Sequence, residues 1–119
     1  MEADVLIIGG GAAGTVAALL LEKAGKHCII LEKNGQIGRK LRITGKGRCN
    51  LTNACDLDTL MANVPRNPKF LYSAFARWMP EDVMAYFEQL GVPLKVERGN
   101  RVFPVSDRAE DIVAALQRA

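Results

Sequence analysis

The chain has 119 residues, of which 49% are hydrophobic and 24% charged, with a net charge of +3; this excludes a disordered or fibrous chain and is typical of one small domain. No run approaches the roughly 20 apolar residues that span a membrane, and the first apolar run begins too close to Met1 for a signal peptide, so we expect a cytoplasmic protein without membrane contact. Cys28, Cys49 and Cys55 match neither a CxxC pair nor a zinc ribbon, which predicts reduced thiols and no metal site.

The chain opens with a predicted βαβ unit. An apolar run over residues 4–8 ends at glycines and predicts a strand buried on both faces of a parallel sheet. Residues 12–24 have a helical pattern with a stripe of mostly small residues that would lie against the sheet. The stripe comprises Ala13, Ala17, Leu20 and Ala24. Gly25 ends the helix, and residues 28–32 predict a second strand, parallel to the first because a helix crosses between them.

The next segment, residues 33–53, shows neither helical nor strand periodicity and predicts a long irregular connection of the kind that carries function. Five cations crowd one part of it: Arg39, Lys40, Arg42, Lys46 and Arg48. This part either faces an anionic ligand or is a solvated basic loop.

Helices are predicted over residues 56–61, 69–78 and 81–90, the last between Pro80 and Gly91. Their aromatic residues are expected in the core: Tyr72, Phe75, Trp78, Tyr86 and Phe87. His27, between the first helix and the second strand, is expected at the surface.

Residues 94–96 and 101–103 predict a small hairpin across Gly99 and Asn100. Asp107 and Glu110 have the spacing of a capping box for a final helix. The apolar face of that helix is formed by Ile112, Val113 and Leu116. Such a face needs a sheet to cover, and two parallel strands bury too little for a doubly wound domain, so we expect further sequence to complete the domain.

Residues 9–14, Gly-Gly-Gly-Ala-Ala-Gly, match GxGxxG between a predicted strand and a predicted helix, which is the context that the motif requires. Gly9 permits the tight turn, Gly11 lets the backbone approach a pyrophosphate, and Gly14 lets helix and strand pack closely. The helix start offers unpaired N–H groups to phosphates. A glycine-rich turn without a ligand is the alternative, but the neighbouring elements all agree with dinucleotide binding.

Glu32 closes the second strand 18 residues after Gly14. A carboxylate there can accept hydrogen bonds from both hydroxyls of an adenosine ribose and would repel a 2′-phosphate, which favours FAD or NAD over NADP. The glycine- and arginine-rich stretch that follows favours FAD, because a long loop beside the pyrophosphate can run along an extended flavin.

Three segments carry a family resemblance. The opening, DVLIIGGGAAGTVAALLLEKAGKHCIILEKN, resembles the FAD-binding start of glutathione-reductase-like flavoproteins. GRKLRITGKGRCNLTN (residues 38–53) and RVFPVSDRAEDIVAAL (residues 101–116) resemble signature segments of the BaiN-type bacterial NAD(P)/FAD-dependent oxidoreductases. The resemblance implies an α/β, Rossmann-like FAD/NAD(P)-binding βαβ unit with additional helices and a hairpin. Residues 1–119 would be the N-terminal part of the FAD-binding domain, with the rest of the domain and an inserted domain outside this sequence.

The resemblance also implies a cofactor site for FAD. The ADP half would be held by Gly9, Gly11, Ala12, Ala13, Gly14, Glu32 and Lys33. The pyrophosphate and ribityl chain would be lined by Arg39, Lys40, Thr44 and Gly45. Further along, Arg48, Asn50 and Asn53 either touch the ligand or hold the loop together by hydrogen bonds.

A catalytic dithiol is disfavoured. Flavin disulfide reductases of this superfamily use Cys-x4-Cys on a helix, whereas five residues separate Cys49 from Cys55, including turn-favouring asparagines.

The first functional hypothesis is an oxidoreductase that transfers hydride or electrons through FAD to or from a small-molecule substrate, with NAD(P)H as an available reductant. The sequence identifies no catalytic residue and no oligomeric state, and nucleic acid is not the expected partner. One alternative is an NAD-dependent Rossmann dehydrogenase, whose substrate loops and proton donor are not recognisable here. The other is an RNA-associated flavoprotein without redox turnover, which the basic residues 39–48 would favour. A partial domain is expected to be inactive alone and to hold flavin weakly.

Overall fold

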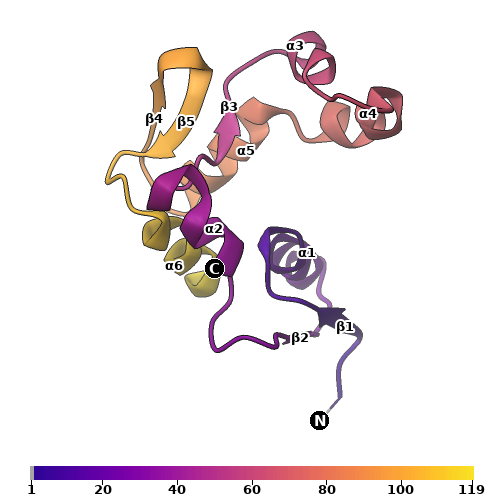
Figure 1. The fold of residues 1–119 in the computed structure, drawn as a ribbon. Helices are drawn as coiled ribbons and strands as arrows, with labels where there is room; N and C mark the ends of the chain where they lie inside the picture. The colour runs from indigo at the N-terminus through magenta and orange to yellow at the C-terminus, as the bar shows by residue number, and fades with distance from the viewer. Residues whose placement is uncertain (1) are drawn as a thin grey trace.

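The computed structural model describes residues 2–119 and contains a two-stranded parallel sheet and a three-stranded antiparallel sheet (Figure 1). The strands are β1 (Val5–Ile8), β2 (Cys28–Leu31), β3 (Thr52–Asn53), β4 (Leu94–Glu97) and β5 (Arg101–Pro104). The α-helices are α1 (Ala12–Lys23), α2 (Arg39–Ile43), α3 (Leu57–Ala62), α4 (Pro68–Arg77), α5 (Pro80–Gln89) and α6 (Ala109–Arg118). Two 3-10 turns are η1 (Thr44–Gly47) and η2 (Arg98–Asn100). The predicted βαβ unit, helices and hairpin are confirmed.

The βαβ unit joins β1 to β2 in parallel, from Val5 opposite Cys28 to Ile8 opposite Leu31, with α1 as the connection. As predicted, a glycine follows the end of the helix: Gly25 has a φ of +79°, in the left-handed region that L side chains rarely adopt. The chain therefore turns sharply into β2.

One face of this parallel sheet is open, so the prediction of burial on both faces is wrong. Leu6 is 57% exposed, Ile8 77% and Leu31 51%. Side chains alternate between the two faces of a strand, and in the described part of the chain α1 covers only the face that carries Ile7. The radius of gyration of 15.0 Å accordingly exceeds the roughly 13.5 Å of a compact domain of this length.

The predicted small-residue stripe on α1 is also wrong, because Ala13, Ala17, Leu20 and Ala24 are all exposed. The helix instead buries Thr15 and Ala18. Small residues lie on every side of α1, so their spacing could not identify the inner face.

Residues 33–53 are more regular than expected, since they contain α2, η1 and β3. β3 pairs with β5 through Thr52 opposite Val102, which gives the sheet order β3-β5-β4. These elements are too short to show a period, and their partners lie about 50 residues further along the chain. Tertiary contacts stabilise them, which a local pattern does not record.

The main core lies around α5 and α6. It comprises Cys49, Phe87, Val92, Ala109, Ile112, Ala115 and Leu116. The predicted apolar face of α6 is therefore confirmed, but the expectation that it needs a parallel sheet is wrong. α2 and β5 pack against α6, and α2 and α6 lie side by side between the hairpin and the βαβ unit (Figure 1).

The predicted capping box at α6 does not form. Arg108 is the N-cap residue, and no side chain caps it. Asp107 accepts hydrogen bonds from Arg48 and Lys95, and Glu110 accepts from Arg42. Long-range cations thus occupy both carboxylates that the local spacing assigned to the helix start.

The aromatic residues divide between core and surface. Phe87 is buried and packs edge to face with Tyr86 at a centroid distance of 5.4 Å, and Phe75 is partly buried. Tyr72 and Trp78 are 54% and 37% exposed, so their predicted core position is wrong in this structure. His27 is at the surface, as predicted.

Candidate functional site

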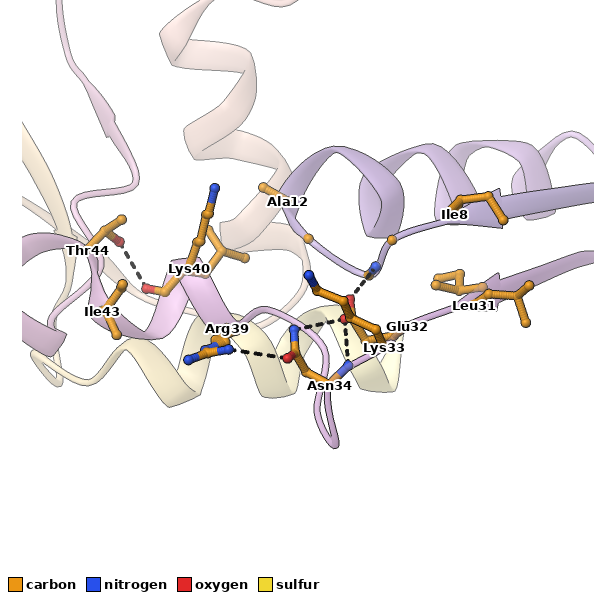
Figure 2. Close-up of a pocket in the computed structure, with 15 residues that line it drawn as sticks. Ile8, Ala12, Leu31, Glu32, Lys33, Asn34, Arg39, Lys40, Ile43 and Thr44 are labelled. Carbon is orange, nitrogen blue, oxygen red and sulfur yellow. Dashed lines mark hydrogen bonds between the residues drawn. The ribbon is translucent and has the colours of Figure 1, made fainter.

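A cavity of about 1340 Å³ lies where β1 and β2 end and α2 begins (Figure 2). This is the edge at which open parallel sheets bind their ligands. Eight predicted site residues line it: Gly9, Gly11, Ala12, Glu32, Lys33, Arg39, Lys40 and Thr44. The cavity also has lining residues that the sequence analysis did not select: Ile8, Gly10, Ile30, Leu31, Asn34, Leu41 and Ile43. Ala13, Gly14 and Gly45 are not among its lining residues.

The three motif glycines have different physical reasons. Gly9 has a φ of +103°, and a β-carbon on Gly14 would lie 2.0 Å from the carbonyl oxygen of Gly9, so the fold itself requires glycine at both positions. A β-carbon on Gly11 would meet nothing within 4 Å, and its φ of −84° suits any residue. The bare backbone at Gly11 is therefore explained by the adjoining cavity and not by the fold.

Gly11 is also the N-cap residue of α1, and no side chain caps the helix. The hydroxyl of Thr15 donates to the carbonyl oxygens of Gly11, at 2.7 Å, and Ala12, at 3.2 Å. Thr15 thus secures the first turn from inside while its N–H groups remain without a side-chain acceptor. An uncapped start of a twelve-residue helix facing a cavity suits a phosphate group.

Glu32 lies at the centre of the cavity and is held by three donors (Figure 2). Its Oε2 accepts from the main-chain N–H of Gly10 at 2.7 Å, and its Oε1 accepts from the main-chain and side-chain nitrogens of Asn34, both at 3.0 Å. The N–H groups of Asn34 and then Gly10 hold the pKa of this carboxyl below its ordinary value. Glu32 is therefore a carboxylate at neutral pH.

The opposite rim of the cavity is cationic. Arg39 and Lys40 are exposed side chains in the first turn of α2, and Lys33 is exposed beside Glu32. Thr44 follows α2, and its hydroxyl donates to the carbonyl oxygen of Leu41 at 2.9 Å. The rim offers an anion two mobile cations, whereas the proton of Thr44 is already bonded to the main chain.

The position of α2 depends on contacts with the glycine turn and with α6. The N–H of Gly38 donates to the carbonyl oxygen of Gly10 at 2.8 Å, and a β-carbon on Gly38 would lie 2.9 Å from a methyl of Val113. Arg42 forms a bidentate pair with Glu110, at 2.9 and 3.2 Å. The basic rim is thereby fixed both to the turn that it faces and to the core helix behind it.

Arg48 takes part in a four-residue ion network with the hairpin. It pairs with Glu97 and, at 2.8 Å, with Asp107, while its guanidinium lies 3.9 Å above the ring centre of Phe103. Lys95 contacts the same two carboxylates at 3.1 and 2.8 Å. Arg48 first and then Lys95 lower the pKa of Glu97, and Lys95 first and then Arg48 lower that of Asp107.

These contacts decide between the two roles left open for part of this loop. Arg48 holds the loop, and the side-chain nitrogen of Asn53 likewise donates to the carbonyl oxygen of Gly99 at 2.9 Å. Asn50 is exposed. Gly45 has a φ of +58°, and a β-carbon there would lie 2.7 Å from the main-chain nitrogen of Asn50, so the fold alone accounts for this glycine.

Cys49 lies in the core with no exposed surface. Burial raises the pKa of its thiol, partly offset by a hydrogen bond with Thr44. A buried thiol with a raised pKa is a poor nucleophile. Within residues 2–119 all three cysteines are unpaired.

A parallel βαβ unit, a GxGxxG turn at its sheet edge and an acid at the end of the second strand together define a Rossmann-like nucleotide-binding protein. The model of the HI0933-like protein Rossmann domain family matches residues 3–119. The chain belongs to this family of Rossmann-fold flavin oxidoreductases, as the resemblance predicted.

Three curated relatives are similar over nearly the whole chain. The 3-dehydro-bile acid delta(4,6)-reductase of Clostridium scindens is 35% identical over 114 residues, covering 93% of the chain and 27% of the relative. The ribosomal RNA dihydrouridine synthase of Haemophilus influenzae is 34% identical, covering 94% and 27%. That of Escherichia coli is 33% identical, covering 95% and 28%. The chain thus spans about a quarter of the length of these relatives. Within residues 2–119, no helix has the length and apolar character to cross a membrane.

Proposed function

We propose that the chain binds FAD, with the ADP half at the glycine turn and Glu32, and serves as the N-terminal part of the FAD-binding domain of a cytoplasmic oxidoreductase. The observation that carries this proposal is the meeting of three features in one cavity. These are the uncapped start of α1, the carboxylate of Glu32 and the cationic side chains of Arg39 and Lys40. Phosphate, ribose and a second phosphate oxygen each find a group of suitable chemistry there.

The residues fit an adenosine diphosphate. The bare backbone at Gly11 admits a phosphate, and Arg39 and Lys40 supply the opposite charge. Three donors already occupy Glu32, and because a carboxylate has about four acceptor positions, about one is left for a ribose hydroxyl. This refines the expectation that Glu32 accepts from both hydroxyls. Its charge would repel a 2′-phosphate.

The bound flavin would supply the hydride-transfer chemistry, while this chain would bind and orient it. The names of the relatives support reduction as the direction of the reaction. One is a reductase, and the others make dihydrouridine, which carries two more hydrogens than uridine. We therefore propose that the substrate is a small molecule that is reduced, with NAD(P)H as the source of electrons.

RNA is the second candidate substrate, because two of the relatives are named for ribosomal RNA. It revives the alternative that the basic residues 39–48 raised. The two candidates differ in salt dependence, since RNA contacts release counterions and weaken steeply as salt rises.

Titration calorimetry with FAD, ADP, NAD and a short RNA tests the proposal. FAD and ADP should bind the chain, weakly because it spans about a quarter of its relatives, and Glu32→Ala should weaken ADP binding about tenfold or more through the lost charged hydrogen bond. NAD binding with no response to FAD would favour the dehydrogenase alternative. RNA binding that survives Glu32→Ala would favour the RNA candidate. A chain that binds neither FAD nor ADP would refute the proposed function.

A further inference from the structure

Four residues around the cavity form a continuous chain of hydrogen bonds (Figure 2). Nη1 of Arg39 donates to Oδ1 of Asn34 at 3.3 Å, and Nδ2 of Asn34 donates to Oε1 of Glu32 at 3.0 Å. Oε2 of Glu32 then accepts from the N–H of Gly10 at 2.7 Å. Asn34 thus links the cationic rim to the acid, although no sequence motif selected it.

An amide is the only side chain of this length that can fill the position. It must donate to a carboxylate on one side and accept from a guanidinium on the other, and Asn has one group of each kind. The partners fix its orientation, because a reversed amide would place oxygen against oxygen and nitrogen against nitrogen. The main-chain N–H of Asn34 also donates to Glu32 at 3.0 Å, which ties the loop itself to the acid.

These bonds fix the orientation of the Glu32 carboxylate before a ligand arrives. One oxygen is bonded to the glycine turn and the other to Asn34, so the group cannot rotate freely. Gly10 contributes as well: a β-carbon there would lie 3.2 Å from Oε2 of Glu32 and 2.8 Å from Ile37. The acceptor position that remains is therefore held in one place, which reduces the entropy lost on binding.

Asn34 also stands between two opposite charges. Within the described residues Arg39 makes no ion pair with Glu32, and its guanidinium bonds to the amide oxygen instead. A direct pair would take the remaining acceptor position of the acid. It would also withdraw Arg39 from the phosphate side of the cavity.

We propose that Asn34 is a positioning residue that sets the selectivity of the site for an unmodified adenosine ribose, by holding Glu32 in place and keeping Arg39 away from it. This inference rests on the proposed function, because it assigns the ribose hydroxyl to Glu32. It goes further in naming the residue on which discrimination depends.

The test compares the affinities of ADP, 2′-deoxy-ADP and adenosine 2′,5′-bisphosphate by titration calorimetry. The parent chain should prefer ADP to 2′-deoxy-ADP by about tenfold or more, the size expected for a hydrogen bond to a charged group. Asn34→Ala should reduce this ratio to about threefold or less and should weaken the rejection of the bisphosphate. Asn34→Asp, which keeps the shape but sets a second carboxylate beside Glu32, should lower the ratio at least as far.

Asn63→Ala is the matched control. Asn63 makes one side-chain hydrogen bond to the main chain, to the carbonyl oxygen of Thr59 at 2.8 Å, and lies outside the cavity. Its ratio should equal that of the parent. Circular dichroism would show that each variant remains folded, and Asn34→Asp tests the proposal if Asn34→Ala does not fold.

The outcomes separate this inference from the proposed function. If the parent chain discriminates but both Asn34 variants lose affinity for the nucleotides equally, Asn34 only supports the loop and the inference is wrong. If ADP binds without discrimination against 2′-deoxy-ADP, Glu32 does not meet that hydroxyl and the inference is also wrong, although the nucleotide site stands. If ADP and FAD fail to bind the parent chain, the proposed function itself is wrong.

Discussion

The βαβ unit and the scaffold formed by α2, α6 and the β4–β5 hairpin are stabilised in different ways. In the βαβ unit, large apolar residues such as Leu6 and Ile8 are mostly exposed, and the helix and strand meet through bare backbone at Gly14. The scaffold contains most of the core, including Ile112, and the ion network of Arg48. The groups suited to phosphate and ribose thus lie on the lightly buried unit, while the scaffold positions the cationic rim opposite them.

The largest difference between the two regions should appear on removing buried carbon. Ile112→Ala should destabilise the chain by about 2–5 kcal/mol, because the side chain is fully buried in the core and truncation leaves a cavity. Leu6→Ala should cost less than about 1 kcal/mol, because more than half of its side chain already meets water. Urea unfolding followed by circular dichroism measures both.

The same pair can contradict the comparison. If Leu6→Ala were as destabilising as Ile112→Ala, the open face of the parallel sheet would be covered in solution. Ile112→Val is a milder check, since it should cost only about 0.5–1.5 kcal/mol.

A second contrast lies within the glycine turn. Gly14→Ala should destabilise the chain by about 1–3 kcal/mol, because the new methyl would lie 2.0 Å from a backbone oxygen and must push helix and strand apart. Gly11→Ala should cost about 1 kcal/mol or less, the preference for glycine over alanine at an N-cap. Its methyl would nevertheless stand between a diphosphate and the start of α1, so ADP affinity should fall about tenfold or more.

Thermal melting and ADP titration of both variants distinguish the two roles. A Gly11→Ala chain that binds ADP as the parent does would show that the bare backbone at Gly11 does not contact phosphate. A Gly14→Ala chain of parent stability would contradict the close packing of α1 on β1.

The sequence predicted the glycine turn and the role of Glu32 as its neighbour because strand, turn and helix are consecutive and their signals are local. It failed on the inner face of α1, where small residues on all sides erase the period. It also missed α2, which is held by contacts such as Arg42 with Glu110, 68 residues apart. Asn34 was missed for the same reason, since its importance lies in two partners that only the folded loop brings together.

The ion network should give the smallest effect and one that depends on pH. The folded pKa values of Glu97 and Asp107 lie below the ordinary values of 4.5 and 3.8, so these carboxylates favour the folded state above the ordinary values. That stabilisation is lost as the pH falls through the lowered folded values and protonates both groups. Arg48→Met should therefore lower the melting temperature at pH 7, and its difference from the parent should shrink between about pH 5 and pH 2.

Arg66→Met is the matched control for this prediction, because the same substitution removes an exposed cation that has no ion pair within residues 2–119. Its difference from the parent should stay nearly constant over the same range. A constant difference for Arg48→Met would show that Arg48 acts through its contact with the ring of Phe103, since stacking does not require the carboxylates to be charged. A difference that shrinks with acid would place the effect in the charges that join residues 38–53 to the hairpin, the feature that the βαβ unit lacks.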